Sequence, residues 1–188
     1  MVPLSRYIAF FSLAGGGVVV DLTTKRWMFD RLGMPRMDEE PWWLVDRVFG
    51  FQTSLNGGAL FGMGQDLWAL FAAFSIFAAI AILLWLFVGR AANQWWLTVA
   101  LALIMAGILG NLYDRLGMPG MLWPAGYSGH HAGETIHAVR DFILMAVGGW
   151  RWPNYNLADS MLVCGAVILV AHAFFTSREE GRELKAES

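Results

Sequence analysis

Two aspartates, Asp141 and Asp159, could do chemistry together because the segment between them can fold back on itself. It contains Gly148, Gly149 and Pro153, residue types that are typical of turns. Two carboxyl groups held close together cannot both ionise easily, so the pKa of one rises and the pair shares a proton. The ionised member can accept a proton from water, and the neutral member can protonate a leaving amine. The pair therefore indicates acid–base hydrolysis of a peptide bond.

Asp159 has a second interpretation, because an apolar run begins directly after it, at Ser160, and is interrupted only by His172 before it ends at Thr176. Asn156 could cap a helix that begins here, and Asp159 would then lie in its first turn, where the helix dipole favours a negative charge. From these residues alone, a capping role and a catalytic role both remain open.

Further polar residues are expected near the same face of a membrane as the two aspartates. Ionisable residues at that depth are rare and usually face a bundle interior or a wet cavity. Asp21 and Lys25 could instead be a simple i,i+4 pair on one helix. The complete set that needs explaining is Asp21, Lys25, Asn56, Asn111, Asp114, Arg115 and Asn156.

The composition indicates a membrane protein. Of the 188 residues, 57% are hydrophobic and 15% are charged, and the ten tryptophans are typical of the aromatic belts at membrane interfaces. A net charge of −2 gives no indication of a nucleic-acid partner. Four histidines and one cysteine are too few for a disulfide framework or a zinc finger.

Four membrane helices are predicted in one domain, residues 1–188. The charge-free run Leu67–Val88 is long enough to cross a hydrocarbon core of about 30 Å. We expect the weakest run, near the N-terminus, to be a retained helix rather than a cleaved signal peptide, since no small-residue cleavage site follows it. The predicted helices cover about 5–27, 67–90, 94–116 and 156–177.

An even number of helices places both termini on one side, with residues 178–188 as a solvated tail. Residues 28–66 and 117–155 then lie on the other side, and more Lys and Arg occur there, so charge alone predicts termini outside. Residues 41–49 ("PWWLVDRVF") are expected to form an interfacial helix. Turn residues at Asn56-Gly57-Gly58 predict a small hairpin or sheet over residues 49–62, lying at the membrane surface.

The sequence also permits other functions. A non-catalytic, lipid-binding membrane protein is one of them, but it would be expected to lose the aspartate pair, and both aspartates are present. The loop "HHAGETIH" (130–137) has imidazole and carboxylate groups that could bind a transition metal, but a solvated Gly-rich loop is the favoured interpretation, and neither a metal nor another cofactor is expected. Proton-coupled transport is the alternative function, since intramembrane carboxylates also relay protons. Against transport, the polar residues cluster at one face, Leu67–Val88 contains no ionisable group, and no path across the bilayer is visible.

Five blocks, in order along the chain, resemble the lipoprotein signal peptidase (signal peptidase II) family. Any single block would be a weak signal, but together they cover residues 21 to 162. The blocks are "DLTTK" (21–25), "NGGALFG" (56–62), "GILGNLYDRL" (107–116), "VRDFI" (139–143) and "WPNYNLADSML" (152–162).

The resemblance implies an all-α membrane fold of four transmembrane helices with a small β-containing periplasmic cradle. Both termini would be cytoplasmic, which overrides the charge count, and the site would lie near the periplasmic face of the bacterial inner membrane. The implied activity is that of an aspartyl endopeptidase, which removes the signal peptide from diacylglyceryl-modified prolipoproteins by cleaving before the lipidated Cys.

The same resemblance implies roles for individual residues. It carries the catalytic pair onto Asp141 and Asp159. The implied partners are the diacylated prolipoprotein, membrane lipids and globomycin-type inhibitors, with no nucleic acid, and the protein is expected to be a monomer. Supporting roles fall on Asp21, Lys25, Asn56, Gly58, Asn111, Asp114, Arg115, Asn156 and Ala158.

Three features depart from the family pattern. Residues 116–138 form a longer loop than is usual there, and the 28–50 segment is also long. Arg140 brings a strong charge to a position that is usually apolar. It could lower the pKa of Asp141, or it could point to water or lipid headgroups.

Overall fold

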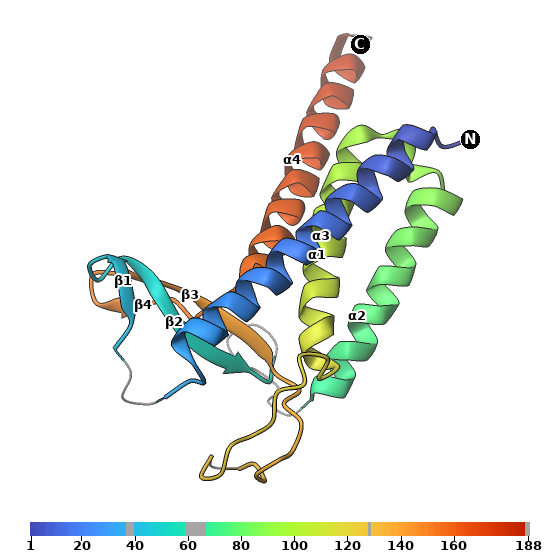
Figure 1. The fold of residues 1–188 in the computed structure, drawn as a ribbon. Helices are drawn as coiled ribbons and strands as arrows, with labels where there is room; N and C mark the ends of the chain where they lie inside the picture. The colour runs from blue at the N-terminus through green and yellow to red at the C-terminus, as the bar shows by residue number, and fades with distance from the viewer. Residues whose placement is uncertain (37–39, 59–66, 128, 187–188) are drawn as a thin grey trace.

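The computed structural model describes the backbone of residues 1–36, 40–58, 67–127 and 129–186, and the side chains as far as residue 175. Four long helices dominate the structure (Figure 1). By length and composition, each is part of a helical stretch apolar enough to cross a membrane, and the second stretch, Trp68–Val88, extends past the end of α2. The helices are α1 (Leu4–Leu32), α2 (Trp68–Leu83), α3 (Trp95–Arg115) and α4 (Leu157–Ala186). A π-helical turn, η2 (Leu84–Val88), and a 3₁₀ turn, η3 (Ala91–Asn93), connect α2 to α3.

Helix α3 is the central helix of the bundle. Over half of its apolar window, 56%, is buried inside the protein, against 11–17% for the other three helices. The outer helices instead expose large apolar side chains such as Phe74, Phe77 and Val170, as expected for surfaces that face lipid. Gly107 lets α3 and α4 approach closely, because a Cβ there would lie 2.5 Å from the Ala158 carbonyl oxygen.

Two helices extend beyond the bounds predicted from the sequence. α1 continues past residue 27 to Leu32 and ends at Gly33, whose φ of +84° favours glycine and whose N–H donates to the Phe29 carbonyl at 2.9 Å. α4 continues past residue 177 to Ala186, so the predicted solvated tail is helical there, and residues 187–188 lie outside the described part. Both extensions are rich in charged residues with good helix propensity, which an apolar-run criterion ignores.

A four-stranded antiparallel sheet joins two distant parts of the chain. Its order is β1 (Trp42–Val45), β2 (Phe49–Asn56), β3 (Val139–Val147) and β4 (Trp150–Arg151). The turn between β1 and β2 lies at residues 46–48, with Arg47 at φ +53°. Residues 49–56 of the predicted hairpin or sheet form β2, which ends at Asn56, paired with Val139. Residues 59–62 of that prediction lie outside the described residues.

The predicted interfacial helix over residues 41–49 is wrong. This segment forms β1, the turn and the start of β2, with Trp42 paired to Phe51. Its aromatic and β-branched residues suit a strand as well as an amphipathic helix, and pairing with β2 satisfies their backbone groups. After α1 ends, the described parts of residues 28–66 contain no further helix.

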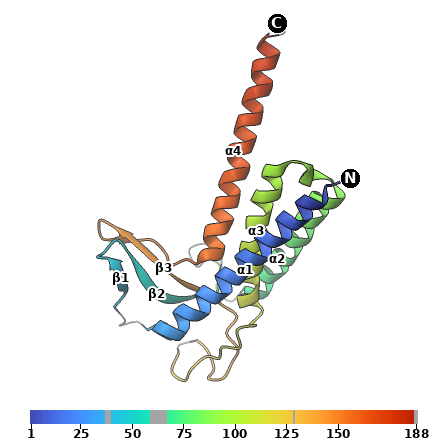
Figure 2. The same cartoon turned by 45° about the horizontal axis from the view of Figure 1, so that its top comes forward.

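The sheet lies at one end of the helix bundle, and both chain termini lie at the other end (Figures 1 and 2). β3 packs against the end of α1 through a cluster of Met28, Phe142 and Ile143. The end of α1, the end of α3 and the start of α4 therefore gather beside the sheet. This end of the molecule carries the polar residues that the sequence singled out.

Candidate active site

Asn156 fixes the start of α4. Its side-chain Oδ1 accepts a hydrogen bond from the backbone N–H of Asp159 at 2.9 Å. In return, Asp159 Oδ2 accepts one from the backbone N–H of Asn156 at 3.2 Å. This reciprocal arrangement is that of a capping box, so the helix start holds the Asp159 carboxylate in place.

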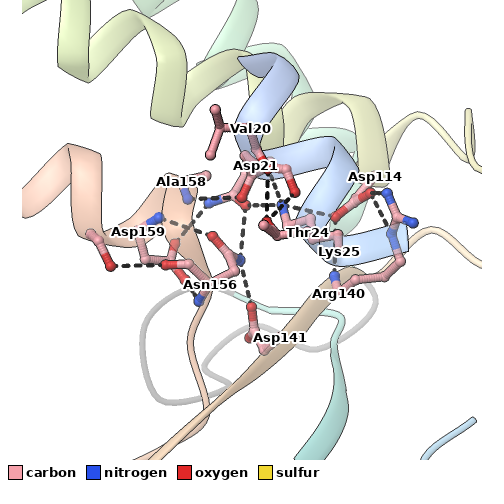
Figure 3. A network of polar contacts seen from close by, with 12 residues as sticks. Val20, Asp21, Thr24, Lys25, Asp114, Arg140, Asp141, Asn156, Ala158 and Asp159 are labelled. Atoms are coloured by element: carbon pink, nitrogen blue, oxygen red, sulfur yellow. Dashed lines mark hydrogen bonds and ion pairs between the residues drawn. The ribbon is translucent and has the colours of Figure 1, made fainter. Parts of the chain in front are cut away.

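The same asparagine links the two aspartates (Figure 3). Asn156 Nδ2 donates to Asp141 Oδ1 at 2.6 Å and to Asn111 Oδ1 at 3.1 Å. Asn111 Nδ2 in turn donates to Asp159 Oδ1 at 2.8 Å. Both carboxylates are thus bonded to one pair of asparagine amides, and Asn156 itself is fully buried.

A chain of buried charges lies behind these amides (Figure 3). Lys25 Nζ lies 2.8 Å from Asp21 and 3.0 Å from Asp114, and it donates to Asn111 Oδ1 at 2.9 Å. Asp114 also pairs with Arg140 at 2.8 Å. The two carboxylates, Asp21 and Asp114, are thus balanced by two cations, Lys25 and Arg140. Such pairing is needed because an unpaired buried charge is strongly destabilising.

Asp21 connects this cluster to α4. Its Oδ1 accepts a hydrogen bond from the backbone N–H of Ala158 at 2.9 Å. Ala158 is fully buried beside Gly110 of α3, where a Cβ would lie 2.4 Å from Asp21 Oδ2. The carboxylate therefore holds three helices together just before Asp159.

Arg140 follows neither of the sequence-based alternatives. Its side chain is only 6% exposed, and its guanidinium binds Asp114 rather than water, headgroups or Asp141. Successive side chains of a strand point to opposite faces, so Arg140 and Asp141 of β3 point apart. The pairing of Arg140 with Asp114 could not be predicted from the sequence, because the two residues lie 26 positions apart along the chain.

Burial raises the pKa of Asp141 well above its usual range, and the charge of Asp159 adds to the effect. The hydrogen bond from Asn156 and the positive charge of Lys25 lower the pKa of Asp141, but by less than burial and Asp159 raise it. Asp141 is 2% exposed. Its surroundings therefore favour the protonated form of Asp141.

The two aspartates line one cavity of about 1010 Å³. Arg115 lies at its polar end, where it donates to the Gly58 carbonyl at 3.3 Å and packs over the Phe71 ring. Asn56 Oδ1 accepts from the Gly58 N–H at 3.0 Å, which holds this backbone turn beside Arg115. Apolar side chains of α3 and α4, including Ile108, Leu162 and Val163, form another part of the wall.

The structure brings together all the site residues predicted from the sequence. Asn56, Asn111, Arg115, Asp141 and Asp159 line the cavity, and Asn156 joins the two aspartates. Asp21, Lys25 and Asp114 are buried behind them, Ala158 contributes its N–H, and Gly58 its carbonyl. The remainder of the "NGGALFG" block, residues 59–62, lies outside the described residues.

Residues 130–137, the candidate metal site of the sequence, contact aromatic rings and the backbone. The His130 ring stacks on Trp123 with centroids 3.7 Å apart, and His137 stacks on Trp68 at 4.0 Å. Glu134 accepts a hydrogen bond from the backbone N–H of His131. Within the described parts of the chain, no three His, Cys, Asp or Glu side chains gather as they would around a metal ion.

Comparison with solved structures supports the fold. Two structures titled as bacterial membrane enzymes solved by the in meso method match with TM-scores of 0.70 and 0.68. They are 21% and 22% identical to this chain. The first match covers 89% of this chain and 88% of the other, and the second covers 87% and 91%.

Comparison with families and curated proteins concerns function. The family model described as signal peptidase (SPase) II matches residues 13–175. A lipoprotein signal peptidase of Rhodopirellula baltica is 44% identical over 92% of this chain and 74% of its own length. One of Pseudomonas fluorescens is 37% identical over 73% and 72%. These matches give no support to the transport alternative. The chain therefore belongs to the signal peptidase II family of bacterial membrane proteins, the peptidases that remove signal peptides from lipoproteins.

Proposed function

We propose that this protein is an aspartyl endopeptidase that cleaves diacylglyceryl-modified prolipoproteins just before the lipidated Cys. The observation that carries the proposal is the pair of asparagines that bonds both Asp141 and Asp159 at the wall of one cavity. Family membership supports the substrate class, and the geometry supports the two-aspartate mechanism.

The surroundings of the two carboxyl groups assign them different roles. Asp141 keeps its proton because its pKa is raised, so it donates a hydrogen bond to the scissile carbonyl. We assign the role of the base to Asp159, which accepts hydrogen bonds at both oxygens, from Asn111 and from the Asn156 backbone. The dyad as a whole therefore carries one proton and one negative charge.

Hydrolysis then needs no covalent intermediate. Asp159 takes a proton from water as the water oxygen bonds to the carbonyl carbon. Asp141 gives its proton to the leaving nitrogen as the C–N bond breaks, and the proton held by Asp159 redistributes within the pair. The products are a carboxylic acid at the end of the signal peptide and a free amine on the lipidated Cys, and no metal is required.

The cavity suits a substrate that is part peptide and part lipid. Its polar end holds the aspartates and Arg115 next to the sheet, while Leu162 and Val163 of α4 line its apolar part. We place the sheet end of the bundle at the periplasmic face of the inner membrane, with both termini cytoplasmic. Membrane lipids and globomycin-type peptides would then reach the same cavity, and the monomer would be sufficient for cleavage.

A gel-shift assay on a diacylated prolipoprotein tests this proposal. Asp141→Asn and Asp159→Asn should each lower the cleavage rate by about 1000-fold or more, since each removes one half of a proton transfer. Asp46→Asn is the matched control, because the Asp46 side chain is 85% exposed on the β1–β2 turn. A chelator should leave the wild-type rate unchanged. Normal cleavage by either dyad variant in its folded state would refute the mechanism.

A further inference from the structure

We propose that Arg140 is a positioning residue for Asp141, which it holds toward the cavity by clamping β3 to the end of α3. The inference rests on the proposed two-aspartate function for its effect on cleavage, and on geometry alone for the clamp. Arg140 is buried, and the hydrolysis described above does not use its charge.

Three donors of Arg140 converge on one carboxylate. Its Nε and a terminal guanidinium nitrogen lie 2.9 and 2.8 Å from Asp114 Oδ1, and its backbone N–H donates to Asp114 Oδ2 at 3.1 Å. Because both the side chain and the backbone of Arg140 are bonded, β3 cannot move relative to α3 without breaking charged hydrogen bonds. Such bonds are among the strongest that proteins form.

The clamp acts next to an irregularity in the pairing of β2 with β3. Asp141 pairs with Ser54 and Arg140 with Leu55, but the ladder is irregular between Phe51 and Ser54. A slip of one residue would exchange the faces of all the β3 side chains. With the guanidinium fixed on one face by Asp114, Asp141 must point to the other, where Asn156 Nδ2 meets it at 2.6 Å.

Asp114 also links Arg140, through Lys25 and Asn111, to Asp159. Its Oδ2 lies 3.0 Å from Lys25 Nζ, and Lys25 donates to Asn111 Oδ1. That contact turns Asn111 Nδ2 toward Asp159. Loss of Arg140 would leave two buried anions, Asp21 and Asp114, on one lysine, so the rest of the cluster would have to readjust.

The test compares Arg140→Met, Arg140→Lys and the control Arg26→Met in the full-length protein. Arg26→Met removes the same charge at the same end of the bundle, but the Arg26 side chain is 83% exposed, in an ion pair with Asp30. We expect Arg140→Met to lower kcat between about 10-fold and about 100-fold with KM within about twofold, because the catalytic groups are displaced while the apolar walls of the cavity are unchanged. Arg140→Lys should recover part of kcat, since it keeps a charge but not the planar fork.

Amide hydrogen exchange tests the clamp without relying on cleavage. Arg140→Met should exchange faster at residues 139–142 while α3 exchanges as in wild type. If the wild type itself does not cleave the prolipoprotein, the proposed function fails, and the exchange result still decides the clamp.

Two outcomes overturn the inference. One is that Arg140→Met matches Arg26→Met in both kcat and exchange. The other is that Arg140→Met and Arg140→Lys melt early but keep wild-type kcat per folded molecule, which would make Arg140 merely structural. If Arg140→Met does not fold, Arg140→Lys alone decides: a lowered kcat at unchanged KM supports the clamp, and a wild-type kcat contradicts it.

Discussion

Asn156 shows how much one small side chain can specify in this protein. Its backbone N–H and its Oδ1 form the reciprocal cap with Asp159, and its Nδ2 bonds Asp141 and Asn111. An ionised aspartate at this position could accept from the Asp159 N–H but could not donate to Asp141 and Asn111. A leucine side chain could neither accept nor donate. The type of residue 156 therefore determines both the helix start and the spacing of the two carboxyl groups.

The raised pKa of Asp141 has a consequence for stability. A carboxyl group whose pKa is higher in the folded than in the unfolded state destabilises the protein as pH rises from the unfolded value, about 3.9, through the folded one. Asp141→Asn removes this penalty while its amide oxygen can still accept from Asn156. We therefore expect the inactive Asp141→Asn protein to melt higher than wild type at neutral pH.

Thermal melts over a pH series check this expectation. The difference in Tm should be several degrees at neutral pH and should vanish below about pH 4, where both states of the wild type are protonated. Asp46→Asn, at an exposed site, should show no such pH dependence. A lower Tm for Asp141→Asn at neutral pH would mean that the ionised carboxylate stabilises the fold.

Site residues could be predicted from the sequence where their types and order matched a known pattern. Asp141 and Asp159 also stood out by chemistry, since paired carboxyl groups flanking a turn suggest a shared proton. Arg140 could not be placed in this way, because a guanidinium is buried only where a carboxylate meets it, and Asp114 does so through tertiary packing. The alternation of side chains along a strand predicts that residues 140 and 141 point to opposite faces. It does not predict which of the two faces borders the cavity.

At the scale of elements, the contact between α3 and α4 positions Asp159. Gly107 lies against the Ala158 carbonyl, one residue before the aspartate. We expect Gly107→Ala to push α4 away, which would lower kcat and cost about 1–3 kcal/mol of stability through overpacking. Cleavage rates and denaturation midpoints of the purified variant measure both effects.

Gly15→Ala is the matched control for that substitution. Gly15 lies in α1, and a Cβ there meets nothing within 4 Å. Alanine should be neutral or stabilising at Gly15 by up to about 1 kcal/mol, because it favours the helix. If Gly107→Ala were as active and as stable as Gly15→Ala, then the close approach of α3 and α4 would not determine the position of Asp159.

Elements could be predicted from the sequence where one physical signal dominates. The four helices follow from apolar runs long enough to span a bilayer. The strand at Trp42–Val45 could not be recognised, because an aromatic, amphipathic segment suits either a strand or an interfacial helix until its partner is known. The pairing of β1 with β2, and of β2 with β3 more than 80 residues away, depends on tertiary structure and could not be predicted from local sequence.

The molecule as a whole combines a polar site with an apolar surface. The sheet lies at one end of the four helices (Figure 1), whose outer surfaces expose many large apolar side chains. The cavity continues along α4 past Asp159. Cys164 lines this continuation, and its side chain is exposed. At about 1.5 Å per residue, it lies about 7.5 Å further along the helix than Asp159.

This depth makes Cys164, the single cysteine of the chain, a probe of where the lipidated part of the substrate lies. A bulky, lipid-soluble maleimide attached at Cys164 should block cleavage, because it fills the apolar part of the cavity. Cys164→Ser protein should keep its own untreated rate after the same treatment. Mass spectrometry gives the extent of labelling, and the gel-shift assay gives the rate.

A second cysteine position separates a blocked cavity from a damaged helix. Val170 lies on the same helix and is 69% exposed, but it does not line the cavity, so Val170→Cys in the Cys164→Ser background should be labelled without loss of cleavage. Diacylated prolipoprotein should also slow labelling of Cys164 in Asp141→Asn protein, which we expect to bind but not to cleave it. Complete labelling of Cys164 with an unchanged cleavage rate would show that the substrate passes elsewhere, and the cavity would then hold the peptide alone.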